Sequence, residues 1–225
     1  MKLALISDVH ANLVALRAVL VDMEGREIAR ILSAGDVVGY YPYPNETVAV
    51  FHERCIESIQ GNHDRAVLSS DPTKFNPAAA SAALWTATRL SDASADYLRE
   101  LPRKLMVEID GIRIAVYHGA PFDDDYYMYE ENVRESLLAM ARSDVLVLGH
   151  THMPFIKRFG SGLIVNPGSV GQPRDGDPEA SYAIYDTVAR KASIRRVAYD
   201  IEEVAARTRE SGLPAALADR LFLGL

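Results

Sequence analysis

The first third of the chain alternates between short apolar runs, polar loops and segments with helical spacing. Leu3–Ile6 is a continuous apolar run, as is typical of a strand buried on both faces. Asn12 precedes apolar positions at helical spacing that end before Gly25. Two further units repeat this order, with strands expected at 28–32 and 55–59 and a helix from about 45 to 54. The alternation predicts an α/β fold with a mostly parallel sheet and helices on its faces.

Helical patterns at 78–90 and 94–101 separate this part of the chain from a region of strands. The clearest signal in that region is Asp110-Gly111, a turn pair that joins apolar runs at 104–109 and 112–117 and predicts a hairpin. A helix from about 131 to 141, a strand at 145–148, and short, antiparallel-looking strands at 155–159, 163–165, 182–185 and 192–197 are expected next. The sequence has no repeat and no linker, so we expect a single domain over residues 1–225, with closing helices from about residue 200.

Composition and charge exclude several classes of protein. The chain has 225 residues, 48% of them hydrophobic, and a formal net charge of −7, which argues against non-specific nucleic-acid binding and against an anionic membrane surface. No apolar stretch reaches the length of a membrane span, and the apolar run at the N-terminus is too short for a signal peptide. Cys55 is the single cysteine, is expected to be a small buried hydrophobe, and fits a reducing compartment. We therefore expect a cytoplasmic protein.

Polar residues that can bind metals follow the predicted strands. Five of the six histidines stand there within three residues of Gly or Asp, and only His52 lies within a predicted helix and has no expected role. The pairs Asp8/His10 and His150/His152 are each two residues apart. In an extended chain such residues point to one side, so each pair is expected to bind at one centre. The candidate ligands are Asp8, His10, Asp36, Asn62, His118, His150 and His152.

This set of donors suits two ions better than one. Two carboxylates, one amide and four imidazoles exceed the needs of one tetrahedral ion, and a carboxylate can bridge two ions. Imidazole-rich coordination without thiols favours Mn, Fe, Co, Ni or Zn over Mg or Ca. Two divalent ions, two carboxylates and one hydroxide leave a formal charge of about +1, which would attract a phosphate anion.

The order of these motifs resembles the calcineurin-like metallophosphoesterase superfamily, in particular its small single-domain bacterial and archaeal members. The motifs are Asp8-Val9-His10, Gly35-Asp36, Gly61-Asn62-His63-Asp64, His118, Gly149-His150-Thr151-His152 and Asn166-Pro167-Gly168-Ser169-Val170-Gly171. The resemblance implies a four-layer α/β/β/α sandwich with mixed sheets. It also implies one ion bound by Asp8, His10, Asp36 and His152, and a second bound by Asp36, Asn62, His118 and His150.

The resemblance further implies that His63 faces the substrate. A metal-bridging hydroxide would attack phosphorus, and His63 would assist the leaving group. Residues 37–40 lack the aspartate–arginine motif found in the phosphoprotein phosphatases of the superfamily, so the sequence identifies no carboxylate partner for His63. Asp64 is expected to cap the helix that follows it.

Three functions remain open from the sequence. The first is a phosphodiesterase acting on a small or nucleotide-like substrate, and the second is a phosphomonoesterase or dinucleoside-polyphosphate hydrolase. The third is a non-catalytic scaffold, like the retromer subunit of this fold, which lacks the motif histidine. A homo-oligomer is compatible with each of these functions.

Several further residues have two readings. Arg174 is either a surface turn residue or a phosphate clamp that acts with Asn62 and His63. Tyr40, Tyr41 and Tyr43 either pack their loop or form a shelf for a nucleobase or aryl group. The acidic run at 123–125 is either a solvated loop or a group of charges that repels anions from one edge of the site.

Overall fold

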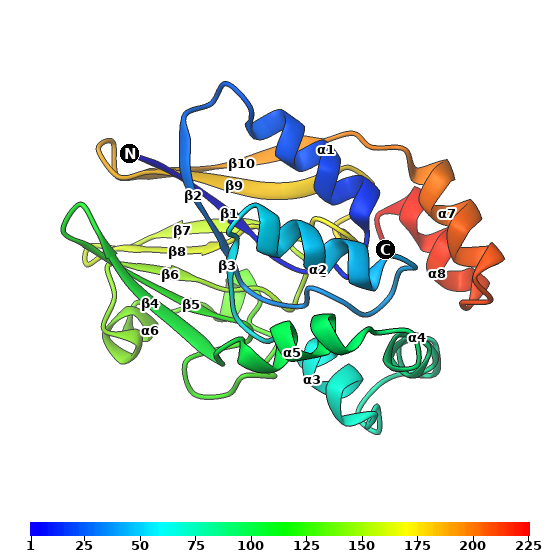
Figure 1. Ribbon diagram of the computed structural model, residues 1–225. Coiled ribbons are helices and arrows are strands. Elements are labelled where there is room, and N and C mark those ends of the chain that lie inside the picture. Colours follow the sequence, from blue (N-terminus) through cyan, green and yellow to red (C-terminus); the bar gives the residue numbers. More distant parts are fainter.

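Two mixed five-stranded sheets lie face to face in the computed structural model, which describes residues 1–225 (Figure 1). The first sheet consists, in order, of β10 (Lys191–Val197), β9 (Ala180–Asp186), β1 (Lys2–Ile6), β2 (Ile28–Ser33) and β3 (Glu57–Ser58). The second consists of β4 (Lys104–Ile109), β5 (Ile112–Tyr117), β6 (Val145–Val147), β8 (Leu163–Asn166) and β7 (Phe155–Arg158). β1, β2 and β3 are parallel, as are β5, β6 and β8, while the remaining neighbours are antiparallel.

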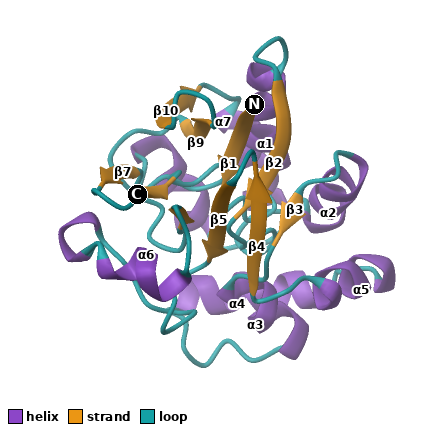
Figure 2. Ribbon diagram, turned by 90° about the vertical axis from the view of Figure 1, so that its left-hand side faces the viewer, coloured by secondary structure: helices purple, strands orange, loops and turns teal.

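Helices cover the outer faces of the sheets and one end of the sandwich (Figures 1 and 2). The α-helices are α1 (Leu13–Met23), α2 (Pro44–Glu53), α3 (Asn62–Ser69), α4 (Pro77–Ala87), α5 (Asp92–Glu100), α6 (Ser136–Ala141), α7 (Ile201–Glu210) and α8 (Ala215–Asp219). Two 3₁₀ helices span Glu130–Asn132 and Arg220–Leu223. No helix is both long enough and apolar enough to cross a membrane.

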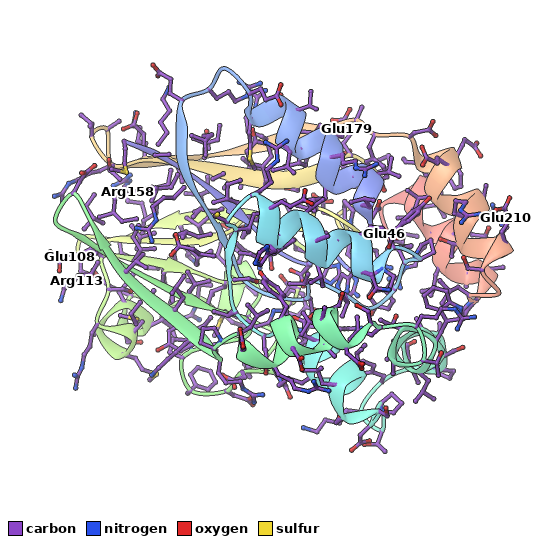
Figure 3. All side chains as sticks on the ribbon, viewed as in Figure 1. Glu46, Glu108, Arg113, Arg158, Glu179 and Glu210 are labelled. Carbon is purple, nitrogen blue, oxygen red and sulfur yellow. The ribbon has the colours of Figure 1, made fainter.

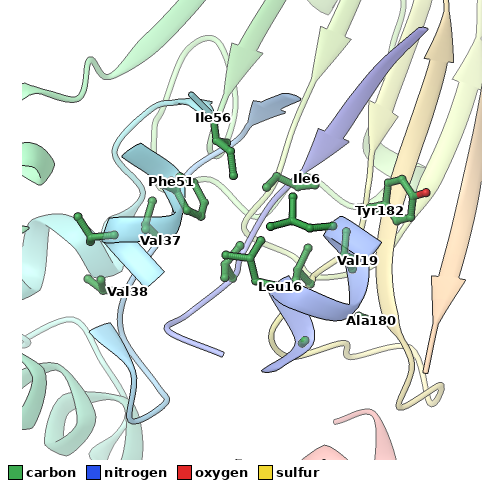
Figure 4. Close-up of a cluster of buried hydrophobic side chains, with 14 of the residues drawn as sticks. Ile6, Leu16, Val19, Val37, Val38, Phe51, Ile56, Ala180 and Tyr182 are labelled. Carbon is green, nitrogen blue, oxygen red and sulfur yellow. The ribbon is translucent and has the colours of Figure 1, made fainter. Parts of the chain in front are cut away.

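The layers follow from side chains that alternate along β1. Leu3 and Leu5 belong to the core between the two sheets, together with residues of β5, β6 and β8. Ala4 and Ile6 point the other way and pack against α1 and α2, as Figure 4 shows for Ile6. A separate core beneath α6 covers the outer face of the second sheet. Truncation of Leu5 to alanine would cost roughly 2–5 kcal/mol, because it opens a cavity between two sheets that cannot easily collapse.

The structure confirms the four-layer sandwich with mixed sheets and several expected elements. The hairpin of β4 and β5 has its predicted bounds, because Asp110 and Gly111 adopt the positive φ angles of 53° and 72° that a two-residue turn requires. α7 begins at Ile201, where the closing helices were expected. The single-domain organisation stays a prediction.

Other expectations from the sequence are wrong in detail. The strand expected at 55–59 is reduced to the two residues of β3, and Cys55 before it is exposed rather than buried. β8 was expected to be antiparallel, but it pairs in parallel with β6 as well as antiparallel with β7. The helix expected from residue 131 begins only at Ser136, after a 3₁₀ turn.

Apart from the buried Asp8, Asp36 and Asp64, most charged side chains lie on the periphery of the molecule. Figure 3 labels six of them, including Glu108 and Arg113 on the β4–β5 hairpin. Arg113 makes two hydrogen bonds with the Asp144 carboxylate, at 3.1 and 2.8 Å. Such an exposed pair contributes at most about 1 kcal/mol to stability, so the interior cores rather than the surface charges hold the layers together.

Candidate metal centre

The predicted metal ligands follow β1, β2, β3, β5 and β6, where the carboxyl ends of parallel strands from both sheets meet. Five of them have left-handed backbones, with φ angles of 54° for Asp8, 53° for His10, 54° for Asp36, 67° for His150 and 61° for His152. Such angles are uncommon outside glycine, cost roughly 1–2 kcal/mol each and concentrate at functional sites. The backbone here is therefore not extended, and the reasoning from alternation that paired these residues does not apply to it.

Asp8, His10 and His152 form the first group of donors. The two Nε2 atoms of His10 and His152 lie 3.1 Å apart. Oδ1 of Asp8 lies 3.4 Å from Nε2 of His152 and 3.8 Å from Nε2 of His10. This oxygen is buried and has no hydrogen-bond partner. Because a buried carboxylate oxygen without a partner is costly, its position among imidazole nitrogens fits a bound cation.

Asp36, Asn62, His118 and His150 form the second group. Nε2 of His118 lies 2.9 Å from Oδ1 of Asn62 and 3.4 Å from Oδ2 of Asp36. The same Asp36 oxygen lies 3.6 Å from Nε2 of His10, so it reaches both groups. The His150 ring lies 4.8 Å from the His118 ring, whereas His152 is beside His10. The expectation that His150 and His152 bind at one centre is therefore wrong, because the left-handed turn sends them to different groups.

Backbone carbonyls orient three of the imidazoles. A carbonyl oxygen can only accept, so the ring nitrogen facing it carries the proton. Nδ1 of His118 donates to the Ala34 carbonyl at 2.7 Å, and Nδ1 of His152 donates to the Gln172 carbonyl at 2.5 Å. Nε2 of His150 donates to the Asp125 carbonyl at 3.0 Å. The opposite nitrogen of each ring is then the one available to bind a metal ion, as in metal-ligating histidines.

Burial sets the protonation states of the cluster. It lowers the pKa of His10 and His152 well below the usual value, and it lowers the pKa of His150 to about 3. Burial raises the pKa of Asp8 to about 7. Burial opposes the charged form of His118, but the Asp36 and Asp8 carboxylates and the hydrogen bond to the Ala34 carbonyl together outweigh it and raise the pKa to about 9. Most of the imidazoles are thus neutral at pH 7, and the donor set fits divalent metal ions.

His63 is held by aromatic rings rather than by a carboxylate. Its ring stacks on Phe75 at 4.3 Å and lies 4.4 Å from the Tyr40 ring. Nδ1 of His63 is buried without a partner, and burial lowers the pKa of the imidazole to about 4. Gly39 makes room for this arrangement, because a Cβ atom there would lie 2.7 Å from Nδ1 of His63 and 3.0 Å from Nδ1 of His10. Its φ of +139° is also one that favours glycine.

Arg174 lies beside Tyr40, close to the centre. Its Nη2 donates to the Tyr40 hydroxyl at 3.1 Å and to Oε1 of Gln172 at 3.0 Å. Tyr40 and Tyr41 are only 3% and 0% exposed, because α4, α7 and α8 pack over them. Neither ring offers an open face to a ligand, so the stacking shelf is wrong for Tyr40 and Tyr41, whereas Tyr43 is partly exposed.

Comparison with known proteins identifies the family. Residues 1–190 match the calcineurin-like phosphoesterase superfamily domain. The chain belongs to this superfamily. An uncharacterized protein of Methanocaldococcus jannaschii is 36% identical over 240 residues, which cover 99% of this chain and 98% of that protein. A crystal structure of a metallophosphoesterase from Sphaerobacter thermophilus is also 36% identical, with a TM-score of 0.87 over 100% of this chain and 99% of that one. Phosphodiesterase YfcE of Escherichia coli K12 is 48% identical over 52 residues, 23% of this chain and 28% of that protein.

Membership in the superfamily assigns the chain to the phosphoesterases, a class of hydrolases, and implies divalent metal ions.

Asp64 connects two of the sequence motifs through its side chain. It is the third residue of α3, not the residue before the helix, and its carboxylate accepts the N–H groups of Gly61 at 2.9 Å and Val38 at 3.0 Å. These bonds tie the loop after Asp36 to the start of α3, which carries Asn62 and His63.

The sequence alone did not identify three residues that contact the histidines. Phe75 stacks on His63, Tyr127 lies 3.9 Å from the His150 ring, and the Gln172 carbonyl accepts from His152. All three lie in loops, and no regular spacing connects them with the ligands. Only their proximity to a motif or an aromatic-rich segment could have pointed to them.

Proposed function

We propose that this chain is a binuclear metal-dependent phosphoesterase that hydrolyses phosphodiesters. The observation that carries the proposal is the convergence of buried donors from two sheets, which leaves Oδ1 of Asp8 without any partner in the protein. We assign Asp8, His10, Asp36 and His152 to one ion. We assign Asp36, Asn62, His118 and His150 to the other.

Each residue has a separate task in this proposal. When bound, two divalent ions of Mn, Fe, Co, Ni or Zn would supply a hydroxide nucleophile near neutral pH and positive charge for the phosphoryl oxygens. Asp36 is suited to the shared position, because its Oδ2 lies 3.6 Å from His10 and 3.4 Å from His118. Asn62 adds a donor without adding negative charge.

His63, Asn62 and Arg174 would bind the phosphate, and His63 would assist the leaving group. A neutral imidazole cannot donate a proton until it acquires one, and burial disfavours that charge on His63. The approach of an anionic phosphate would offset the burial and stabilise the protonated ring. His63 would then protonate the leaving oxygen, while Arg174 holds a non-bridging oxygen.

A His63→Ala variant tests this assignment. Turnover should fall by roughly 10²-fold or more, the scale of a lost general acid, while bound metal stays unchanged. His52→Ala is the matched control, because His52 is an exposed residue of α2 and should leave both turnover and metal content unchanged. Unchanged turnover in His63→Ala would remove His63 from the chemistry.

Phosphodiesters are preferred because a part of the chain is similar to a phosphodiesterase. The proposal is tested with bis-p-nitrophenyl phosphate and p-nitrophenyl phosphate, each assayed with Mn²⁺, Co²⁺, Ni²⁺, Zn²⁺ and Fe²⁺ and with measured metal content. Faster hydrolysis of the diester is expected. Hydrolysis of the monoester alone would replace the proposal by a phosphomonoesterase, and hydrolysis of neither by metal-loaded protein would favour a non-catalytic scaffold.

The cellular setting is part of the proposal. The single cysteine is exposed and unpaired, which fits a reducing compartment, and we place the activity in the cytoplasm. The net charge of −7 disfavours long nucleic acids as partners, so we expect a small or nucleotide-like phosphoester.

A further inference from the structure

Four aromatic side chains are exposed in the loop that follows His118. Within residues 118–133 they are 37–54% exposed, although aromatic side chains of this size are usually well covered. The four are Phe122, Tyr126, Tyr127 and Tyr129. The Tyr127 and Tyr129 rings lie 6.3 Å apart and are inclined by only 17°, so they present surfaces of similar orientation.

The loop that carries these rings is firmly attached to the protein. Met128 and Val133 are buried beneath it, and Ala120 and Asp123 exchange two backbone hydrogen bonds. The carboxylate of Asp124 accepts from Arg103 at 3.0 Å, and that of Asp125 pairs with Arg65 and Lys74. The rings are therefore displayed on an ordered surface, where little entropy is lost on binding.

These ion pairs also decide between the two readings of the acidic run. Asp124 and Asp125 each face a cation, and the Asp123 carboxylate accepts the backbone N–H of Asp125 at 2.9 Å. Through these contacts, residues 123–125 hold the loop in place. The charges of Asp124 and Asp125 are compensated locally, which reduces their repulsion of an anionic ligand near the rings.

Tyr127 places this aromatic surface at the edge of the metal centre. Its ring lies 3.9 Å from that of His150. Burial raises the pKa of its hydroxyl, and the nearby Arg174 guanidinium only partly offsets this effect. A pocket of about 150 Å³ beside the loop is bordered by Asn62, Phe75 and Asp125. A phosphate bound by Asn62, His63 and Arg174 would therefore have its ester group within reach of Tyr127.

We propose that Tyr127 and Tyr129 form a subsite for a planar aromatic group on the substrate, so that the enzyme acts on phosphoesters of nucleosides. This inference rests on the proposed function, because it places the ester group of a substrate whose phosphate lies at the metal centre. Every nucleobase has a π face, and stacking on an exposed aromatic side chain contributes about 1–3 kcal/mol per base. Tyrosine rings that are fixed and half-exposed suit this role better than the buried Tyr40 and Tyr41.

The test compares two non-hydrolysable ligands by isothermal titration calorimetry on the manganese-loaded protein. They are the phosphonate analogues of AMP and of ribose 5-phosphate, in which a CH₂ group replaces the bridging oxygen. The two differ only in the base, so stacking should make the AMP analogue bind about 5- to 150-fold more tightly. Tyr127→Ala should reduce this ratio to about 1–2, whereas Tyr127→Phe keeps the ring and should keep the ratio.

A second variant distinguishes the loss of aromatic stacking from damage to the metal site. Tyr129 pairs with Tyr127 and not with His150, so Tyr129→Ala should lower the ratio several-fold at unchanged metal content. Equal affinities of the two ligands for wild-type protein would overturn the subsite and leave the phosphoesterase proposal intact. Binding of neither ligand would overturn the phosphate site and the subsite with it. A dimer that dissociates in Tyr127→Ala, with no change in the ratio, would overturn the subsite and identify these rings as a contact between two copies of the chain.

Discussion

Gly39 lies against the His10 and His63 imidazoles, so Gly39→Ala tests how closely the side chains of the metal centre are packed. The new Cβ atom would lie 2.7 Å from Nδ1 of His63, whereas ordinary contact begins at 3.4 Å, so the ring must move by about 0.7 Å. It cannot move freely, because Phe75 and Tyr40 enclose it at 4.3 and 4.4 Å. A misplacement of 1 Å at a reacting group can cost about 10²-fold in rate, so we expect turnover to fall by roughly 10- to 100-fold.

Backbone strain is a separate effect that this experiment must distinguish from the displacement of the rings. Alanine at a φ of +139° is strained and should lower the free energy of unfolding by about 1–3 kcal/mol. Gly212→Ala is the matched control, since Gly212 has a φ of +75° and nothing within 4 Å of a new Cβ atom. It should lose roughly 1–2 kcal/mol and keep full turnover. If the two variants showed similar losses of stability and both kept wild-type turnover, the close packing of His63 and its catalytic role would be refuted together.

Three further predictions concern other parts of the site. Asp64→Asn replaces one of two accepting oxygens by a donor that faces a backbone N–H. The free energy of unfolding in urea should therefore fall by about 1–3 kcal/mol. An unchanged urea midpoint would contradict the link that Asp64 makes between Val38 and Gly61. Arg174→Ala should raise KM for a phosphoester by about 10- to 150-fold with a smaller effect on kcat. Arg113→Ala is the control and should change neither constant. If Arg174→Ala had the same KM as the wild-type protein, Arg174 would be a surface turn residue with no part in binding phosphate. Metal at 100 times its Kd should raise the free energy of unfolding by about 2.7 kcal/mol relative to chelated protein, and identical thermal transitions with metal and with chelator would exclude binding linked to folding.

The parts of the fold that were predictable are those in which local chemistry specifies local structure. Leu3–Ile6 is apolar at every position because β1 packs on a second sheet with one face and on α1 with the other. Asp110-Gly111 has the backbone preferences of a two-residue turn, so the hairpin of β4 and β5 has its predicted bounds. The parallel pairing of β6 with β8 involves strands separated by a whole antiparallel strand, β7, and no local signal encodes it.

In the candidate site, the identity of the metal-binding residues was predictable from the sequence, but the direction of their side chains was not. The seven donors were identifiable because parallel strands bring their carboxyl ends together, and the structure places these side chains in two adjoining groups. Their roles as ligands stay a prediction. The separation of His150 from His152 was not derivable from spacing, because it depends on a left-handed backbone that no alternation rule anticipates.

The aromatic residues near the centre show why exposure could not be deduced from composition. Tyr40 and Tyr41 precede a helix in a loop rich in proline, much as Tyr126 and Tyr127 lie in a loop rich in aspartate. The first pair is covered by α7 and α8, which come more than 150 residues later. Tyr127 lies against the His150 and Tyr129 rings and stays 47% exposed. Whether a tyrosine becomes a core residue or a binding surface is thus decided by distant packing. The loop after His118 is left open beside the donors, so any selectivity for the organic part of the substrate should depend on that loop.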